Sequence, residues 1–391
     1  MEIETYFENK KTVVRYMIYS PELKKKQFKK TYIFGTLFLR SFLFCIILCF
    51  FAQSKFMKST IFFKNKPSVI ATSTVAGPKE AEGKLGKFIE NVFYDDTFGE
   101  ETYEKAECKM IALAIENAIK NAMLGENDIN AIISGDLLNQ IISSSFSARK
   151  FDIPYLGVYN ACSTMTEALA IGSTLVDGGY FENVIAATGS HFATAERQYR
   201  YPLELGAVRP PQSQWTVTGA GATVISSKRK NKDCFPQITA ATFGKVVDYG
   251  VTDANNMGAA MAPAAANTII THFKETGRDP DYYDLVLTGD LGALGSRLCK
   301  KLCFEKCFDI DKNHVDCGEL IYNIDEEEFQ GGSGAGCSAV VFNSYIYKKM
   351  LKRQIKRVLF VATGALLSTL STQQGESIPA IAHAVSVETE E

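Results

Sequence analysis

Apolar runs rich in β-branched residues alternate with longer amphipathic stretches through most of the chain. Four such runs occupy residues 131–137, 183–189, 285–291 and 357–364. Runs as apolar as these are typical of strands that are buried on both faces of a helix-covered sheet. Between them, residues 106–124 and 264–276 carry apolar side chains at helical spacing. Strands that alternate with helices predict an α/β fold.

The four strand-like runs form two similar pairs. AIISGDL at 131–137 returns as LVLTGDL at 285–291, and NVIAATG at 183–189 returns as RVLFVATG at 357–364. The two pairs follow the same order and lie about half a chain apart. This indicates a duplicated α/β unit, which we divide into residues 57–230 and 231–391.

Cys162 lies where an apolar segment meets a helical stretch. Residues 155–159 are typical of a strand that ends in a sharp turn, and the run 165–171 has helical spacing. A helix N-terminus lowers a thiol pKa and stabilises a thiolate or a bound anion. This would present a nucleophile. The alternative is a buried cysteine that packs as a small apolar side chain.

Residues 1–56 differ from the rest of the chain. Five lysines between positions 24 and 30 precede the apolar run 32–51, which is long enough to cross a bilayer. Basic residues before such a run favour a cytoplasmic N-terminus and a signal anchor, although Arg40 interrupts it. A second interpretation is a cleaved signal peptide, although the run lacks a cleavage site with the usual small residues. The third is an untranslated extension, because Met57 resembles a natural start. In each case residues 1–56 lie outside the predicted fold.

Composition and charge narrow the class of protein. The chain has 391 residues, 46% of them apolar and 22% charged, so it can bury a large core. A net charge of −2 and the lack of a basic stripe argue against nucleic-acid binding. Ten cysteines without a pairing pattern indicate a reduced compartment. The spacing of four residues between Cys299, Cys303 and Cys307 indicates one partly buried helix face, and we favour this over a metal site. Likewise we interpret residues 314–317, which hold three possible ligands, as a turn near the pocket and not as a metal site.

Longer blocks add a more specific signal. They are AGPKE at 76–80, GDLLNQ at 135–140, GSH at 189–191, TAERQYRYP at 194–202, AMAPAAA at 260–266, GGSG at 331–334, ATGALLS at 362–368 and ESIP at 376–379. Together they resemble the stage V sporulation protein AD family, a thiolase-like branch found in endospore-forming bacteria. The resemblance runs from about Met57 to the C-terminus, and the block around Glu196 is not a general thiolase feature.

The resemblance implies a fold and a function. The fold would be two similar α/β halves related by a pseudo-twofold axis, with helices layered around two mixed sheets. The function would be binding of dipicolinic acid and assistance in its uptake into the developing spore. The protein would lie peripherally at the forespore inner membrane with other stage V sporulation membrane proteins. A homodimer and a calcium ion bound together with dipicolinate remain open.

The sequence lacks the residues that usually help a condensing cysteine. Such enzymes need His or Asn partners that stabilise an enolate and move protons. In thiolase-like enzymes one partner follows the strand that 284–287 resembles, and the other comes from a Gly-Gly loop. Here Gly289 takes the first place, and the loop 331–338 contains neither His nor Asn. We therefore expect a binding protein in place of a condensing enzyme.

A dicarboxylate site needs cationic forks, backbone N–H groups and a flat apolar slot. We expect the Cys162–Ser163 turn to supply N–H groups, Arg197 or Arg200 to hold a carboxylate, and His191 to donate a hydrogen bond.

Asp136 and Asp290 are the acids that follow the repeated strands. Each could cap the next helix, bind the accompanying calcium or order a loop, and we favour capping.

Two other classes of function stay open. The first is an acyltransferase or hydrolase that uses Cys162 as nucleophile, with His191 or His314 as helper. The second is a structural subunit whose pocket is a relic. We predict no bound cofactor and no metal centre.

Overall fold

The computed structural model describes residues 2–8, 11–17, 58–199, 208–227, 235–323 and 329–389. The chain divides into two compact units, Met1–Met57 and Lys58–Glu391. In the first unit, β1 (Glu2–Glu8) and β2 (Lys11–Met17) pair as an antiparallel hairpin. The apolar run 32–51 lies outside the described residues. Within the described ranges, no helix has the length and hydropathy that a bilayer crossing needs.

Twelve strands of the second unit form one mixed sheet. Ten follow the order β13-β12-β15-β16-β11-β4-β10-β8-β6-β7, while β3 pairs with β11 and β5 with β4. The strands are β3 (Thr60–Phe62), β4 (Ser68–Ala76), β5 (Asn91–Val92), β6 (Ala131–Gly135), β7 (Tyr155–Gly157), β8 (Asn183–Ser190), β10 (Gly219–Ser226), β11 (Gln237–Thr242), β12 (Leu285–Thr288), β13 (His314–Asp316), β15 (Arg357–Ala365) and β16 (Ala380–Glu388). Two short strands, β9 (Trp215–Thr216) and β14 (Gly332–Ser333), pair separately in parallel.

The two halves of this sheet repeat one arrangement of five strands. In the first, β6 lies between its parallel neighbours β7 and β8, and β10 runs antiparallel to β8 and β4. In the second, β12 lies between its parallel neighbours β13 and β15, and β16 runs antiparallel to β15 and β11. Identical order and direction confirm the predicted duplication and pseudo-twofold.

The junction of the halves differs from the expected pair of separate sheets. Ser68 of β4 lies opposite Gln237 of β11, and this pair joins the two groups into one continuous sheet. The first half ends with β10 at Ser226 and the second begins with β11 at Gln237, and the predicted boundary at residue 230 lies outside the described residues.

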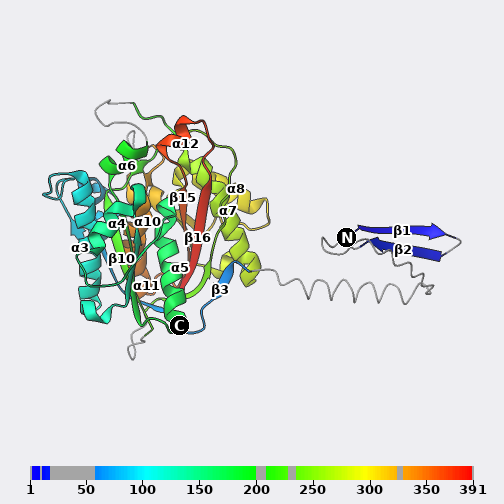
Figure 1. Cartoon of the computed structure of the whole chain (residues 1–391), viewed down its shortest axis with the longest axis horizontal. Helices are drawn as coiled ribbons and strands as arrows, with labels where there is room; N and C mark the ends of the chain where they lie inside the picture. The colour runs from blue at the N-terminus through cyan, green and yellow to red at the C-terminus, as the bar shows by residue number, and fades with distance from the viewer. Residues whose placement is uncertain are drawn as a thin grey trace, which may run out of the picture. The chain divides into compact units, whose positions relative to one another are not determined.

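Helices cover both faces of each half (Figure 1). They are α2 (Pro78–Glu82), α3 (Tyr103–Asn121), α4 (Ile142–Ala148), α5 (Thr164–Asp177), α6 (Phe192–Tyr199), α7 (Met257–Thr276), α8 (Gly292–Phe304), α9 (Cys317–Ile321), α10 (Ala335–Val341), α11 (Tyr347–Leu351) and α12 (Thr369–Gln373). On the outer faces, α3 packs on β4 and β10, and α7 packs on β15 and β16. The central helix α5 contacts β6 and β8 on one side and β15 and β16 on the other.

The two predicted helices correspond to α3 and α7, but both begin earlier than their apolar pattern indicates. Thr102 accepts the Lys105 N–H at 3.3 Å at the start of α3, and Asn256 accepts the Ala259 N–H at 3.4 Å at the start of α7. Each side chain satisfies a backbone donor that a helix N-terminus otherwise leaves unpaired.

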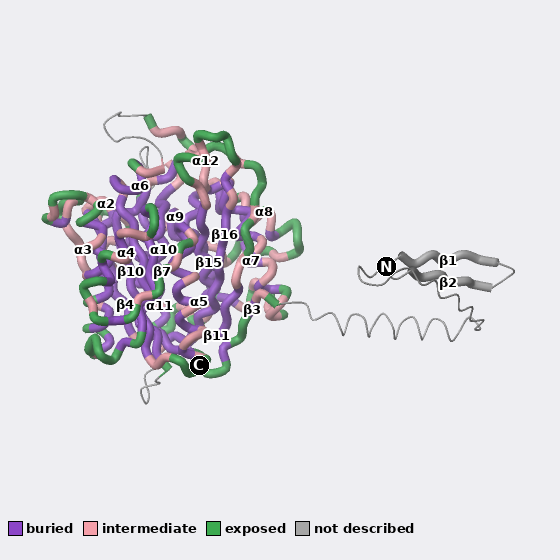
Figure 2. The backbone as a smooth tube through the Cα atoms, in the orientation of Figure 1, coloured by how far each residue is buried: buried purple, intermediate pink, exposed green. Residues whose placement is uncertain are grey.

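The core is continuous through the central layer (Figure 2). Every residue of β8 and β10 is buried, as the apolar runs predict for strands covered on both faces. Met165 and Leu169 of α5 are fully buried in the same cluster as Phe342 and Phe360, whose rings stack at 4.7 Å. This packing fixes α5, and therefore the turn that carries Cys162 at its N-terminus.

Candidate functional site

Cys162 lies in a strained turn between β7 and α5, as predicted. Residues Ala161–Ser163 form one 3-10 turn, and α5 begins at Thr164. Ala161 has φ 51°, a left-handed conformation that costs a residue with a Cβ roughly 1–2 kcal/mol. The backbone of β15 supports the turn closely, because a Cβ placed on Gly364 would lie 2.2 Å from the Asn160 carbonyl oxygen.

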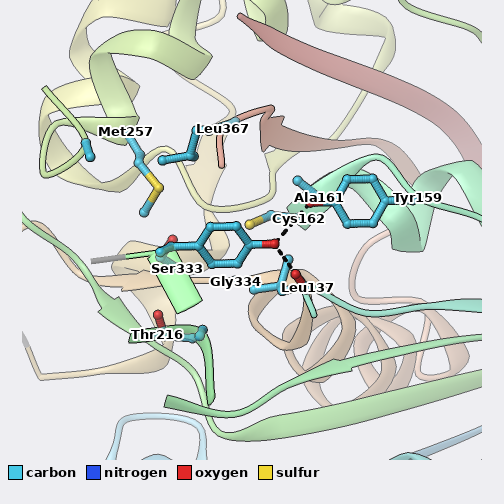
Figure 3. Close-up of a pocket in the computed structure, with 13 residues that line it drawn as sticks. Leu137, Tyr159, Ala161, Cys162, Thr216, Met257, Ser333, Gly334 and Leu367 are labelled. Atoms are coloured by element: carbon cyan, nitrogen blue, oxygen red, sulfur yellow. Dashed lines mark hydrogen bonds between the residues drawn. The ribbon is translucent and has the colours of Figure 1, made fainter. Parts of the chain in front are cut away.

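A narrow pocket opens above this turn, as Figure 3 shows. It is lined by Leu137, Tyr159, Ala161, Cys162, Ala195, Tyr199, Thr216, Ala254, Met257, Ser333, Gly334, Ala365 and Leu367. Met257 and Leu367 lie on one side of the pocket and Thr216 on the other (Figure 3). The lining is mostly apolar, and none of these described residues carries a positive charge. Hydroxyl and thiol groups supply the side-chain polarity.

Asp290 is buried beneath the pocket and ties three segments together. Its carboxylate accepts the Gly334 N–H at 2.9 Å, the Ser333 hydroxyl at 3.2 Å and the Thr363 hydroxyl at 2.7 Å. Burial raises the pKa of Asp290 above its usual value, and hydrogen bonds from Thr363, Gly334 and the Cys162 thiol oppose that rise. An acid beside Cys162 disfavours a second negative charge on the sulfur.

The acids that follow the repeated strands have different roles. Asp136 accepts the Leu138 N–H at 2.9 Å and the Ser144 N–H at 2.7 Å, so it caps α4 as expected. Asp290 does not cap the helix that follows it, which corrects that part of the expectation. Asp316 does so instead, since it accepts the N–H groups of Leu291 and Gly292 at 2.9 and 3.0 Å. Burial raises the pKa of Asp316 to about 7.

The two positions expected to lack catalytic partners provide none in the structure. A Cβ on Gly289 would lie 2.9 Å from the Ala362 Cα, so no side chain fits there without a backbone shift. The glycine loop presents Ser333 to the pocket, and its hydroxyl donates to Asp290. Neither a serine hydroxyl nor a glycine can act as a general base near neutral pH.

Arg197 does not line the Cys162 pocket. It lies with Asn139, Thr194 and Gln198 in a separate shallow depression, 3.9 Å from Glu104. Its guanidinium also lies 5.2 Å from the centre of the Tyr103 ring. The prediction that Arg197 lies over the Cys162 turn is therefore wrong. Arg200 lies outside the described residues.

His191 and Ser163 already form hydrogen bonds with other parts of the protein. The buried His191 pairs Nε2 with the Asp96 carbonyl at 2.7 Å, and its Nδ1 accepts the Ala193 N–H at 3.1 Å. Burial lowers the pKa of His191, which favours the neutral ring that this pairing needs. The Ser163 N–H donates to the Asn160 carbonyl at 3.1 Å, and its hydroxyl donates to the same oxygen. Neither residue lines the pocket.

Two tyrosines and one acid of the site were not singled out from the sequence. Tyr159 and Tyr199 line the pocket and place their hydroxyl oxygens 3.2 Å apart. Glu196 lies behind the lining residue Thr216 and pairs with Arg209 at 3.4 Å. The sequence did contain a signal for each of them: Tyr159 lies next to the cysteine turn, and Glu196 and Tyr199 lie in the 194–202 block.

Within the part of the chain that the structure describes, the other cysteines and histidines have structural positions in the fold. Among the residues that the structure describes, no group of three or more His, Cys, Asp or Glu side chains is arranged to hold an ion. Cys299 and Cys303 are buried in α8, whereas Cys307 beyond its end is exposed. His314 pairs with the Thr288 hydroxyl at 3.0 Å at the end of β12.

The duplicated sheet and the cysteine turn define a thiolase-like protein. The fold is similar to that of 3-oxoacyl-[acyl-carrier-protein] synthase III from Aquifex aeolicus VF5, with a TM-score of 0.50 and 14% identity, covering 82% of this chain and 99% of that one. It is also similar to acetamide-bound OleA from Xanthomonas campestris, with a TM-score of 0.52 and 14% identity, covering 84% of this chain and 100% of that one. At such identities the likeness shows the fold alone.

A closer relationship identifies the family. The model of the family Stage V sporulation protein AD matches residues 57–388. The Stage V sporulation protein AD of Bacillus subtilis (strain 168) is 46% identical over 328 residues, which cover 84% of this chain and 96% of that protein. The chain therefore belongs to the stage V sporulation protein AD family, and it is a sporulation protein on a thiolase-like fold.

Proposed function

We propose that this protein binds dipicolinate in the Cys162 pocket and assists its uptake into the developing spore, as a thiolase-like pseudoenzyme. One observation carries the proposal: the Cys162 turn and its pocket are intact, while the partner positions hold Gly289 and Ser333. A protein that keeps the pocket without the proton-transfer groups is suited to binding a small molecule without converting it.

The side chains that line the pocket are suited to a flat aromatic ligand. Ala161, Leu137 and Leu367 give apolar walls, and the rings of Tyr159 and Tyr199 stand at the pocket. Small-molecule sites are mostly apolar, with a few polar groups that fix orientation. A pyridine ring would contact the walls, and a carboxylate would reach the Tyr159 hydroxyl. The hydroxyls of Ser333 and Thr216, which donate to Asp290 and Glu196, would turn toward the ligand to donate to it.

The charge pattern gives the proposal a specific form. Because the described lining has no cation, the carboxylates would be held by neutral donors, and Arg197 would remain with Glu104. Calcium remains an optional co-ligand in this proposal. Asp290 would not be its ligand, since its oxygens already accept hydrogen bonds from Ser333, Gly334, Thr363 and the Cys162 thiol.

The competing function is acyl transfer or thioester hydrolysis with Cys162 as nucleophile. The enzymes that share this fold favour it. The buried Asp290 beside the thiol opposes it, because a nearby carboxylate makes a thiolate more costly. His191 and His314 cannot serve as the helper, since each is hydrogen-bonded away from the pocket.

In the cell, we propose a peripheral position at the forespore inner membrane beside other stage V sporulation membrane proteins. The family membership supports the link to sporulation. A homodimer is compatible with this position.

A calorimetric titration of the full chain tests the proposed ligand. We expect dipicolinate to bind with one site per chain and more tightly than picolinate, which lacks the second carboxylate. Parallel titrations with and without calcium decide whether the ion binds together with the ligand. Equal affinity for dipicolinate and picolinate, or no heat from either, would refute the ligand assignment.

A further inference from the structure

The Cys162 pocket is too small for an aromatic ligand in its present state. Its cavity volume is about 40 Å³. A buried water molecule needs roughly 10–15 Å³ by the same measure, so the space holds about three waters. A pyridine ring with two carboxylates is several times larger. Some part of the lining has to move before such a ligand enters.

Tyr199 is the lining residue best placed to make that room. It is the last residue of α6, so its ring reaches the pocket from a helix end. Its hydroxyl donates to the Leu137 carbonyl oxygen and lies 3.2 Å from the Tyr159 hydroxyl. Leu137 and Tyr159 both line the pocket, and Figure 3 shows them together beside Cys162. Tyr199 also packs against the buried cluster that contains Leu137, Ala161 and Cys162.

The groups that hold Tyr199 keep other partners when it leaves. The Leu137 carbonyl also accepts the Gln198 Nε2 at 3.0 Å, and Gln198 is itself fixed by the Asn139 N–H at 2.9 Å. Tyr159 is 42% exposed, so its hydroxyl can bond to water. When Tyr199 leaves, the Leu137 carbonyl therefore stays hydrogen-bonded and the partly exposed Tyr159 can turn toward water, which limits the desolvation penalty.

We propose that the Tyr199 ring plugs the Cys162 pocket in the unliganded protein and that the ligand displaces it. The ring then indicates what the pocket accepts: a flat six-membered aromatic ring with an oxygen substituent at its inner end. The proposal depends on the function proposed above only for the name of that ligand. In this proposal Tyr199 controls entry to the pocket. The Tyr159 hydroxyl exchanges its hydrogen bond with Tyr199 for one with the ligand.

Access to the Cys162 sulfur tests the plug without any ligand. The full chain is treated with iodoacetamide, and modification of Cys162 and of the exposed Cys307 is followed by peptide mass spectrometry. In Tyr199→Ala we expect the Cys162 rate, relative to Cys307, to rise by roughly tenfold or more, because the ring and its two hydrogen bonds are gone. Tyr199→Phe keeps the ring and should give a smaller rise.

The control is Tyr180→Ala, since Tyr180 is 77% exposed and does not line the pocket. It should leave the Cys162 rate unchanged. Equal or undetectable Cys162 modification in wild type and in a folded Tyr199→Ala would overturn the proposal.

Ligand entry supplies the second measurement. The single tryptophan, Trp215, precedes the lining residue Thr216, so stopped-flow tryptophan fluorescence can follow association of dipicolinate. We expect Tyr199→Ala to associate faster than wild type, and an unchanged or slower rate would overturn the plug. If Cys162 access rises in Tyr199→Ala while no variant binds dipicolinate, the plug stands and the proposed function fails.

Discussion

The Asp290 carboxylate accepts the Gly334 N–H at 2.9 Å, and this bond ties the turn after β12 to the glycine loop before α10. The same carboxylate holds the Thr363 hydroxyl of β15. One buried acid thus fixes three segments that meet at the Cys162 pocket.

Removal of this acid should destabilise the fold. In Asp290→Ala, the Gly334 N–H and the Thr363 hydroxyl lose a buried acceptor, each at about 1–3 kcal/mol. Asp290→Asn should cost less, because its amide oxygen can still accept the Gly334 N–H and the Thr363 hydroxyl can turn. Urea denaturation measures both. The exposed Asp281→Ala is the control, and an Asp290→Ala variant as stable as that control would contradict the assigned role.

Glu80 should make stability depend on pH. Burial raises its pKa from 4.5 to about 7, although Thr218 and Tyr322 donate to it. A raised carboxyl pKa means that the folded state binds the proton more tightly, so this contribution is complete below pH 4.5 and is lost as pH rises to about 7. Over that range wild type should lose on the order of 3 kcal/mol relative to Glu80→Gln.

The measurement is urea unfolding at a series of pH values from 4 to about 8, a range that brackets both pKa values. Glu116→Gln is the matched control, because Glu116 is exposed on α3. Parallel pH profiles for wild type and Glu80→Gln would show that the buried acid does not titrate as described.

Gly364 should tolerate no side chain. A Cβ there would approach the Asn160 carbonyl oxygen to 2.2 Å, so Gly364→Ala must displace the turn that carries Cys162. We expect a loss of about 1–3 kcal/mol in stability, typical of overpacking, and weaker dipicolinate binding. At Gly125 the nearest atom is 3.6 Å away, which makes Gly125→Ala a suitable control. If Gly364→Ala melts with the control and binds normally, the turn is not held as described.

No acyl-group chemistry should be detectable. The full chain is incubated with acetyl-CoA, and both free coenzyme A and condensed products are measured by mass spectrometry. Turnover should stay at background, because neither Gly289 nor Ser333 can move a proton for Cys162. Turnover that disappears in Cys162→Ala would establish the enzyme in place of the binding protein.

The sequence predicted the buried framework well, for a physical reason. The runs that became β6, β8, β12 and β15 are apolar along most of their length, and strands covered on both faces typically have that pattern. The turn at Cys162 was equally clear, because small residues and a change of periodicity mark the start of α5. The strands β6 and β12 ended before the acids, since Asp136 and Asp290 turn to accept backbone N–H groups.

The sequence could not predict in which direction each side chain of a short helix points. Arg197 was expected over Cys162, but two residues along α6 it is Tyr199 that lines the pocket. Neighbouring positions on a helix point about 100° apart, so the register of α6 decides which of them faces the cysteine. That register depends on packing against Thr216 and Leu137, contacts between segments far apart in the chain.

The most direct test of the account is calorimetric binding of dipicolinate to the full chain, with Cys162→Trp as the decisive variant. An indole at position 162 fills the pocket, so the folded variant should show no binding, whereas wild type and Arg197→Ala should bind alike. A folded Cys162→Trp protein that binds dipicolinate as tightly as wild type would contradict the account, because the ligand would then lie elsewhere.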